Sequence, residues 1–147
     1  MTSFLRHSLE TLKITANFHR DGLNPEIFVQ NSELQKFYSV LTTNVDTQNH
    51  RFVSVMEGKT IPVYAVQFHP EKNCFDNNPK FHIPRSLESV LASQYFANFF
   101  VSEARKSEHS FASKDEELTY SMDQFVPIID PEPEMGQTFL QVYVWKN

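Results

Sequence analysis

The feature that most constrains the fold is an apolar run at residues 61–68, in the middle of the chain. The run is apolar on both faces, which is typical of a strand covered above and below in the centre of a sheet. Pro62 stands near its start, where a missing backbone N–H is tolerated. Residues 40–45 and 52–56 are two further β-rich runs, separated by a short polar segment at hairpin distance. We therefore expect a sheet with residues 61–68 as its central strand.

Three other stretches show helical spacing. A helix is predicted over about residues 3–13, with Thr2 or Ser3 as its cap. Asn31 or Ser32 is expected to cap a two-turn helix through Tyr38. In the second helix we expect the following side chains to point inward: Leu34 and Phe37. The longest helix is predicted over about residues 87–106 after the cap Ser86. Its expected core stripe is Leu87, Val90, Leu91, Tyr95 and Phe99.

Helices and strands together predict an α/β fold, but without the repeated βα units of a complete doubly wound sheet. A short extended segment at 14–19 ends at breaks near Gly22 and Asn24-Pro25, and residues 69–85 are expected to form a loop. A final strand is predicted at 139–145. With 147 residues the chain is long enough for one domain, residues 1–147, in which 108–147 is expected to be a C-terminal extension packing on the rest.

Composition excludes several classes of function. The chain has 13 basic and 18 acidic residues, a formal net charge of −5, which argues against binding to nucleic acid. No stretch approaches the roughly 20 apolar residues of a membrane span, and residues 1–13 lack the apolar region of a signal peptide. Only three glycines occur, far apart, so a P-loop, a dinucleotide fingerprint and a glycine-flanked nucleophile elbow are absent from these residues.

The residues best suited to chemistry are His69 and Glu71, which follow the predicted central strand. Open α/β sheets place their active sites at this end of their strands. In an extended backbone, positions i and i+2 project to the same side, so the carboxylate can accept an imidazole N–H and leave the other ring nitrogen as a general base. The same His-Pro-Glu tripeptide is also common at plain strand-to-loop transitions, so both interpretations stay open.

Other candidates carry weaker signals. Cys74 is the single cysteine, so no internal disulfide is possible, and it lacks the constrained turn typical of a catalytic thiol. His69, Cys74 and His82 match no known zinc spacing, and we expect no metal site. His19 precedes a turn and is, by pattern alone, an ordinary histidine.

Several segments, taken in order, resemble the C-terminal half of the γ-glutamyl hydrolases, which cleave folate polyglutamates and belong to the class I glutamine amidotransferase-like fold. The resemblance covers nearly the whole chain. It rests on these segments: Thr-Ala-Asn-Phe-His at 15–19, Val-Leu-Thr-Thr-Asn at 40–44, Met-Glu-Gly at 56–58, Val-Gln-Phe-His-Pro-Glu-Lys-Asn at 66–73, Ile-Pro at 83–84, Tyr-Phe-Ala-Asn-Phe-Phe at 95–100 and Glu-Ala-Arg-Lys at 103–106.

The resemblance implies specific roles. His69 matches the catalytic histidine that activates a cysteine, Glu71 the acidic residue that orients it, and His19 a histidine beside the substrate cleft. The implied reaction is hydrolysis of γ-glutamyl bonds in folate poly-γ-glutamate through a thioester, without metal or organic cofactor. Lys72 and Arg20 are either anion contacts or plain solvent-facing cations. The implied location is the lysosome, the vacuole or the outside of the cell, and a homodimer is possible.

One departure from the family outweighs the matches. The family's nucleophile lies in a glycine-flanked elbow in the N-terminal half, for which these 147 residues have no counterpart. We therefore expect a partial three-layer, flavodoxin-like fold with its N-terminal half missing, and no activity from this chain alone. A non-catalytic fragment that binds a γ-glutamyl ligand or a partner protein is the alternative.

Overall fold

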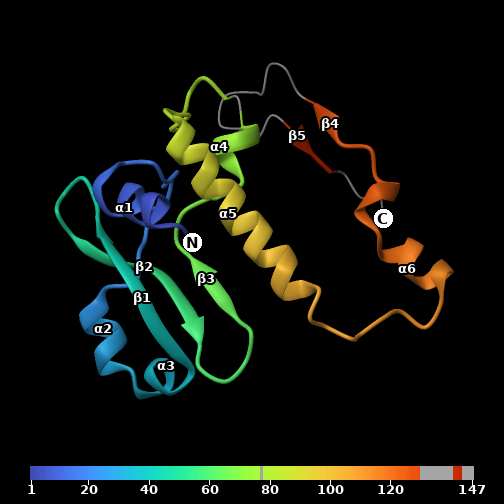
Figure 1. Ribbon diagram of the computed structural model, residues 1–147, viewed down its shortest axis with the longest axis horizontal. Coiled ribbons are helices and arrows are strands. Elements are labelled where there is room, and N and C mark those ends of the chain that lie inside the picture. The colour runs from blue at the N-terminus through green and yellow to red at the C-terminus, as the bar shows by residue number, and fades with distance from the viewer. Residues whose placement is uncertain (77, 130–140, 144–147) are drawn as a thin grey trace.

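The computed structural model describes residues 1–76, 78–129 and 141–143 of the chain. Helices surround a small antiparallel sheet, which confirms the predicted α/β class (Figure 1). The elements follow in the order α1 (Ser3–Thr11), α2 (Pro25–Gln30), α3 (Ser32–Phe37), β1 (Tyr38–Val45), β2 (Arg51–Gly58), β3 (Tyr64–Val66), α4 (Lys72–Phe75), α5 (Leu87–Ala104), α6 (Lys114–Tyr120), η1 (Met122–Gln124), β4 (Ile128–Ile129) and β5 (Gln141–Val142).

The predicted hairpin is present as strands β1 and β2, paired from Tyr38 opposite Gly58 to Val45 opposite Arg51. Its connection begins at Asp46, whose carboxylate Oδ1 accepts the backbone N–H groups of Gln48 at 2.8 Å and His50 at 2.7 Å. Asn49 adopts a φ of 67°, a left-handed conformation that asparagine tolerates better than most residues. The polar segment between the two β-rich runs therefore supplies its own turn.

The third strand corrects a prediction. Within the described residues the sheet order is β1-β2-β3, so β2 is central and β3 lies at the edge. Only three residues of the apolar run form a strand, because the Gly58 N–H bonds to the Val63 carbonyl at 2.7 Å and the residues between them form a turn. Tyr64 is 40% exposed, so this strand is not covered on both faces.

The three predicted helices are confirmed together with their caps, while three short α-helices and one short 3₁₀-helix in the described residues were missed. The Thr2 hydroxyl accepts the Leu5 N–H in α1, the Asn31 side chain accepts N–H groups of α3, and Ser86 accepts the Ser89 N–H in α5. The missed α-helices are α2, α4 and α6, and the missed 3₁₀-helix is η1. Helix α2 has the cap Asn24 and a proline at its first position, a common helix start that the sequence analysis interpreted as a break.

The inward faces of α3 and α5 also differ from the prediction. In α3, Phe37 is exposed and no residue is fully buried. In α5 the buried residues are Ser89, Ala92 and Ser93. These small side chains let the helix approach α1, where Ala92 packs with Leu5 and Ile14. The predicted core stripe is therefore only partly right. Its members Tyr95 and Phe99 are partly buried, whereas Leu87, Val90 and Leu91 are exposed.

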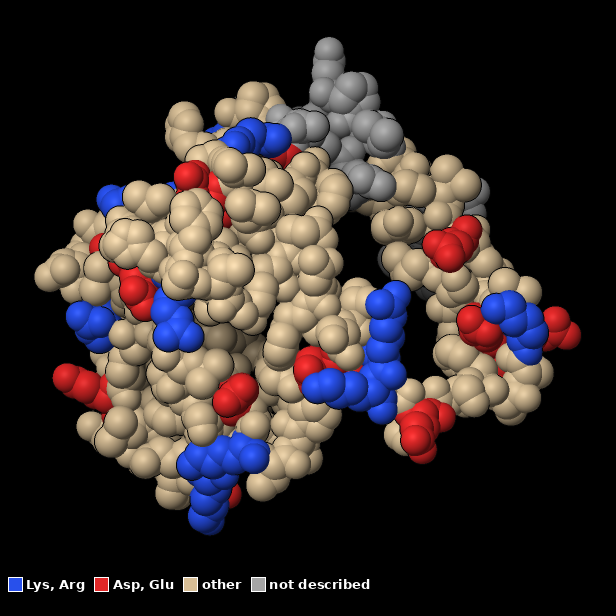
Figure 2. Space-filling model, viewed as in Figure 1, with Lys and Arg blue, Asp and Glu red and all other residues tan. Residues whose placement is uncertain are grey.

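The opposite side of α5 is apolar and exposed. We call it the outer face and define it as Leu87, Val90, Leu91 and Val101, which are between 36% and 68% exposed. Figure 2 shows that the surface over the middle of this helix carries neither acidic nor basic side chains. The apolar positions of α5 were therefore correctly recognised, but most of them face away from the core.

After α5 the chain runs away from the sheet to α6 and returns through η1 towards β4 (Figure 1). Of the strand predicted at 139–145, Gln141 and Val142 form β5, Tyr143 is not in a strand, and residues 139–140 and 144–145 lie outside the described residues. How residues 108–147 pack as an extension stays a prediction. Among the helices in the described part of the chain, none is long and apolar enough to cross a membrane.

Candidate active site

Two segments far apart in sequence meet just beyond the end of β3. The Gln67 N–H donates to the Ser54 carbonyl at 2.8 Å, which keeps the chain alongside β2 for one residue past the strand. The His69 N–H then donates to the Ala16 carbonyl, also at 2.8 Å. This bond places the extended segment 14–19 beside residues 67–69, and it brings His19 to His69.

His69 and Glu71 are in contact as predicted, but the backbone between them is not extended. Glu71 has a helical conformation (φ −71°, ψ −24°) and the Lys72 N–H donates to the His69 carbonyl at 3.3 Å, so a turn into α4 makes the contact. The His69 Nδ1 lies 3.0 Å from the Glu71 Oε1, across the intervening Pro70. An ionised carboxylate can only accept a hydrogen bond, so Nδ1 holds the proton and the Nε2 lone pair is left to act as a base. The His69 side chain is 34% exposed and that of Glu71 is 64% exposed, so both remain accessible from outside.

His19 lies against His69. The two rings are stacked with centroids 4.7 Å apart and an interplanar angle of 16°. Partial burial lowers the pKa of His19 below its ordinary value, and the positive charge of a protonated His69 lowers it further. A hydrogen bond to the Gln67 backbone and the charge of Glu71 oppose this shift without cancelling it. His19 therefore favours the neutral form beside the proposed base.

An aromatic and ionic cluster lies next to the histidines. The Phe18 and Phe81 rings are 4.7 Å apart, and the Lys72 ammonium lies 5.9 Å and 5.7 Å from their centroids. Lys72 also pairs with Asp76 at 2.8 Å, and the side chains of the pair are only 13% and 18% exposed. Lys72 is therefore not the solvent-facing cation that the sequence allowed, whereas Arg20 is exposed.

Burial alone would raise the pKa of the Asp76 carboxyl, but other contacts outweigh it. Hydrogen bonds from Lys72 and from the Asn78 backbone, together with the charges of Lys72 and Arg85, hold the pKa below its ordinary value. Arg85 also donates to the Asp76 carbonyl. These contacts tie together the residues on both sides of the loop after His69.

Other sequence candidates are not brought to the histidines. Cys74 lies on α4, and its Sγ is 4.0 Å from the Val90 carbonyl of α5 rather than bonded to His69. His82 is exposed. Within residues 1–76, 78–129 and 141–143, no group of three or more His, Cys, Asp or Glu side chains could hold a metal ion.

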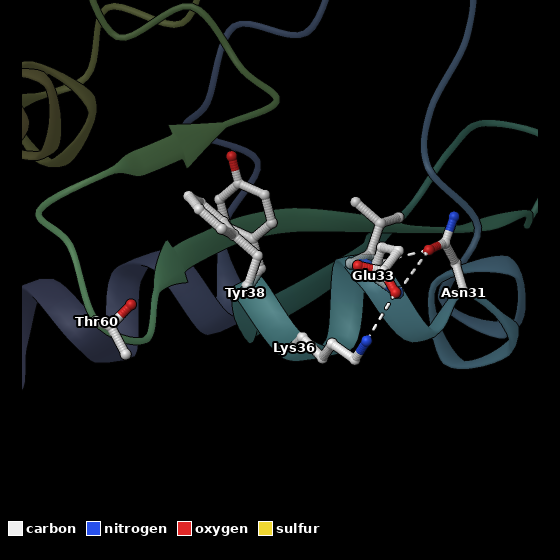
Figure 3. Close-up of a pocket in the computed structure, with 7 residues that line it drawn as sticks. Asn31, Glu33, Lys36, Tyr38 and Thr60 are labelled. Atoms are coloured by element: carbon white, nitrogen blue, oxygen red, sulfur yellow. Dashed lines mark hydrogen bonds and ion pairs between the residues drawn. The ribbon is translucent and has the colours of Figure 1, made fainter.

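A hollow of about 520 Å³ lies elsewhere, at the end of the molecule formed by α3, the start of β1 and the turn before β3 (Figure 3). Lys36 and Glu33 form an exposed ion pair on its α3 side, and Tyr38 and Thr60 face it from the other elements. None of its lining residues belongs to the histidine cluster. Of the histidine cluster, His19 and Glu71 are exposed and His69 is partly exposed.

Asn73 was not predicted as a site residue; it is buried and bonded to two other segments of the site. The only sign of its importance in the sequence was that it ends the segment 66–73, one of those that carry the family resemblance. Phe81 was missed for the same reason, because a contact with Phe18 across 63 positions leaves no trace in local spacing.

Comparison with known proteins finds relatives that are all named γ-glutamyl hydrolases. The chain is 44% identical to the human γ-glutamyl hydrolase over 121 residues, covering 82% of this chain and 38% of the relative. The rat γ-glutamyl hydrolase is 41% identical over 124 residues, covering 84% and 39%. Dictyostelium discoideum γ-glutamyl hydrolase B is 42% identical over 114 residues, covering 78% and 32%. No protein-family profile matches the chain.

The chain spans less than two fifths of the length of these curated relatives. The identity over about four fifths of this chain is nonetheless well above 30% in each case. The chain is therefore homologous to part of the γ-glutamyl hydrolases, which confirms the resemblance drawn from its motifs.

Proposed function

We propose that this chain supplies the histidine and carboxylate of a γ-glutamyl hydrolase active site that acts on folate poly-γ-glutamates. The observation that carries the proposal is the His69–Glu71 contact at 3.0 Å, which fixes the tautomer a general base needs. His19, stacked on His69, is the proposed substrate contact on the same surface. The relatives are named γ-glutamyl hydrolases, and the substrate class comes from them and from the resemblance.

The proposed reaction needs a thiol that these residues do not place. A cysteine outside the 147 residues transfers its proton to His69 Nε2, and its sulfur attacks the γ-carbonyl carbon of the substrate. The C–N bond then breaks, the proton passes from His69 to the departing amino group, and a thioester remains. Water, deprotonated by His69, hydrolyses the thioester and returns the thiol. Thiol, base and water suffice, so no cofactor takes part.

The missing thiol implies a missing part of the fold. Residues outside this chain would complete the three-layer, flavodoxin-like architecture of the family beside β3, the edge strand of the sheet in the described residues. The same proposal places the enzyme in a lysosome or vacuole or outside the cell, and allows a homodimer.

The test is a chimera in which this chain replaces the matching segment of the rat γ-glutamyl hydrolase, assayed with a γ-linked diglutamate substrate. We expect turnover by the chimera, none by the 147-residue chain alone, and a loss of about 10³-fold or more on His69→Asn. His50→Asn is a matched control, because His50 also pairs with a carboxylate, Asp46, at 3.2 Å, but on the hairpin.

A folded chimera without turnover would contradict the catalytic proposal. If the isolated chain then still bound the diglutamate, the alternative of a non-catalytic ligand-binding fragment would replace it. Turnover by the isolated chain that disappeared on Cys74→Ala would instead show that Cys74 is the nucleophile.

A further inference from the structure

Hydrogen bonds behind the histidines converge on Asn73. This residue lies on α4, four positions after His69, and is 3% exposed. Its Nδ2 donates to the Ile14 carbonyl at 3.1 Å and to the Pro84 carbonyl at 2.8 Å. A side-chain amide has two N–H donors, so both are used. One buried side chain thus joins α4 to two segments that are 59 and 11 positions away.

One of these bonds reaches the segment that carries His19. Ile14 and Ala16 are both buried, at 4% and 1% exposure, and the Ala16 carbonyl accepts the His69 N–H. The segment 14–19 is therefore held at two points, by the backbone of His69 and by the side chain of Asn73. Two points of attachment fix both the position and the direction of a short extended segment, and hence where His19 emerges from it.

The other bond anchors Asn73 itself. The same Pro84 carbonyl lies 3.0 Å from the Ser89 hydroxyl. Ser89 is completely buried, and its one hydroxyl hydrogen is shared between the Pro84 carbonyl and the Ser86 carbonyl, which is 2.8 Å away. Pro84 lies in the loop two residues before the cap Ser86, and Ser89 lies in the first turn of α5, which packs on α4. Asn73 therefore transmits the position of α5 to the segment 14–19.

We propose that Asn73 is a positioning residue that holds the His19 imidazole against the His69 imidazole. The proposal depends on the proposed function for its catalytic meaning, but the geometry it describes can be tested without any turnover. Asparagine suits this place because it offers two donors in a small volume. Leucine offers none, so it would remove the donor from the buried Ile14 carbonyl.

The experiment is NMR spectroscopy of the full 147-residue chain at a concentration at which it is monomeric. In the wild type we expect a nuclear Overhauser effect between the ring protons of His19 and His69, and a His19 titration below the ordinary range. In Asn73→Ala we expect loss of the ring-to-ring effect and a rise of the His19 pKa towards its ordinary value.

Ser89→Ala is the matched control. It removes a buried hydroxyl from the same Pro84 carbonyl, but Ser89 makes no bond to the segment 14–19. We expect it to lower the melting temperature and to leave both histidine signals unchanged. The proposal is overturned if Asn73→Ala keeps both signals, or if Ser89→Ala loses them equally.

A measurement on the wild type covers the case in which Asn73→Ala does not fold. The two Nδ2 protons of Asn73 should exchange with deuterium far more slowly than those of exposed Asn44. Equal exchange rates would overturn the proposal. Failure of the chimera assay with these NMR results intact would remove the enzymatic function and leave the positioning role of Asn73 standing.

Discussion

The two faces of α5 differ in a way that hydrophobicity alone does not indicate. The inner face consists of Ser89, Ala92 and Ser93, which are buried and, around Ser89, hydrogen-bonded to the loop that carries the proposed site. The outer face (Leu87, Val90, Leu91 and Val101) is apolar and exposed. Small size and hydrogen bonding, rather than apolar character, decide which face lies inward in this chain.

The difference has an energetic meaning. Full burial of one aliphatic side chain contributes about 1.5–3 kcal/mol, so the four partly exposed residues of the outer face leave roughly 4 kcal/mol unrealised. That amount approaches the whole stability of a small domain, about 5 kcal/mol. Among the described residues, the side of α5 that supports the histidines is buried, whereas the outer face stays exposed.

The largest effect is expected from placing a charge on each face. Ala92→Asp buries a carboxylate at a site that is 3% exposed, and should lower the free energy of unfolding by about 3 kcal/mol or more. Leu91→Asp, at a site 42% exposed, should change it by less than about 1 kcal/mol. Urea denaturation measures both, and equal losses would show that the faces are not distinct.

The next effect concerns association. We expect the isolated chain to self-associate, because the outer face is apolar over the uncharged middle of α5. Leu87→Ser combined with Leu91→Ser should weaken association by roughly tenfold or more, at about 1.4 kcal/mol per tenfold. Ile27→Ser with Val29→Ser, two exposed residues of α2, is the control. Light scattering that finds a monodisperse wild-type monomer would contradict this expectation.

A smaller effect is expected at the ionic cluster beside the inner face. Lys72→Met leaves the Asp76 carboxylate without its main partner, and should cost about 1–2 kcal/mol near pH 7. The pKa of Asp76 is lower in the folded than in the unfolded state, so its charge stabilises the folded state at any pH above the unfolded-state pKa. This contribution is lost as the pH falls below about 4. The cost of Lys72→Met should therefore shrink in acid.

Lys114→Met provides the comparison, because the Lys114–Glu117 pair is well exposed, at 72% and 50%. Exposed pairs of this kind contribute little. Thermal melts at pH 7 and pH 3.5 measure both variants. A Lys72→Met cost that stays constant with pH would mean that the Asp76 charge is not what Lys72 stabilises.

The smallest effect is expected at His19. Its lowered pKa means that the unfolded state binds more protons than the folded state near pH 6, so His19 makes stability fall as the pH drops from 7 to 5. His19→Asn should therefore be relatively more stable at pH 5 than at pH 7, compared with the wild type. Melting curves at the two values measure the difference, and a shift of opposite sign would contradict the stacked geometry.

Local features were predictable from the sequence, and distant ones were not. The helix caps, the hairpin and the His69–Glu71 contact depend on residues within a few positions of one another, and all appear as expected. The edge position of β3 and the inward face of α5 depend on which segments pack together. The meeting of His19 and His69 depends on bonds that span 50 positions or more, and only the resemblance to a family pointed to it.

The bond from Asn73 to Ile14 also has a consequence for folding kinetics. It closes a loop of 59 positions, and such distant contacts form slowly. The β1–β2 hairpin lies inside that interval and can form first, which shortens the flexible part of the loop and lowers the entropy lost on closure. We therefore expect the imidazole pair to assemble late in folding, so that slowing the hairpin would delay the appearance of the site.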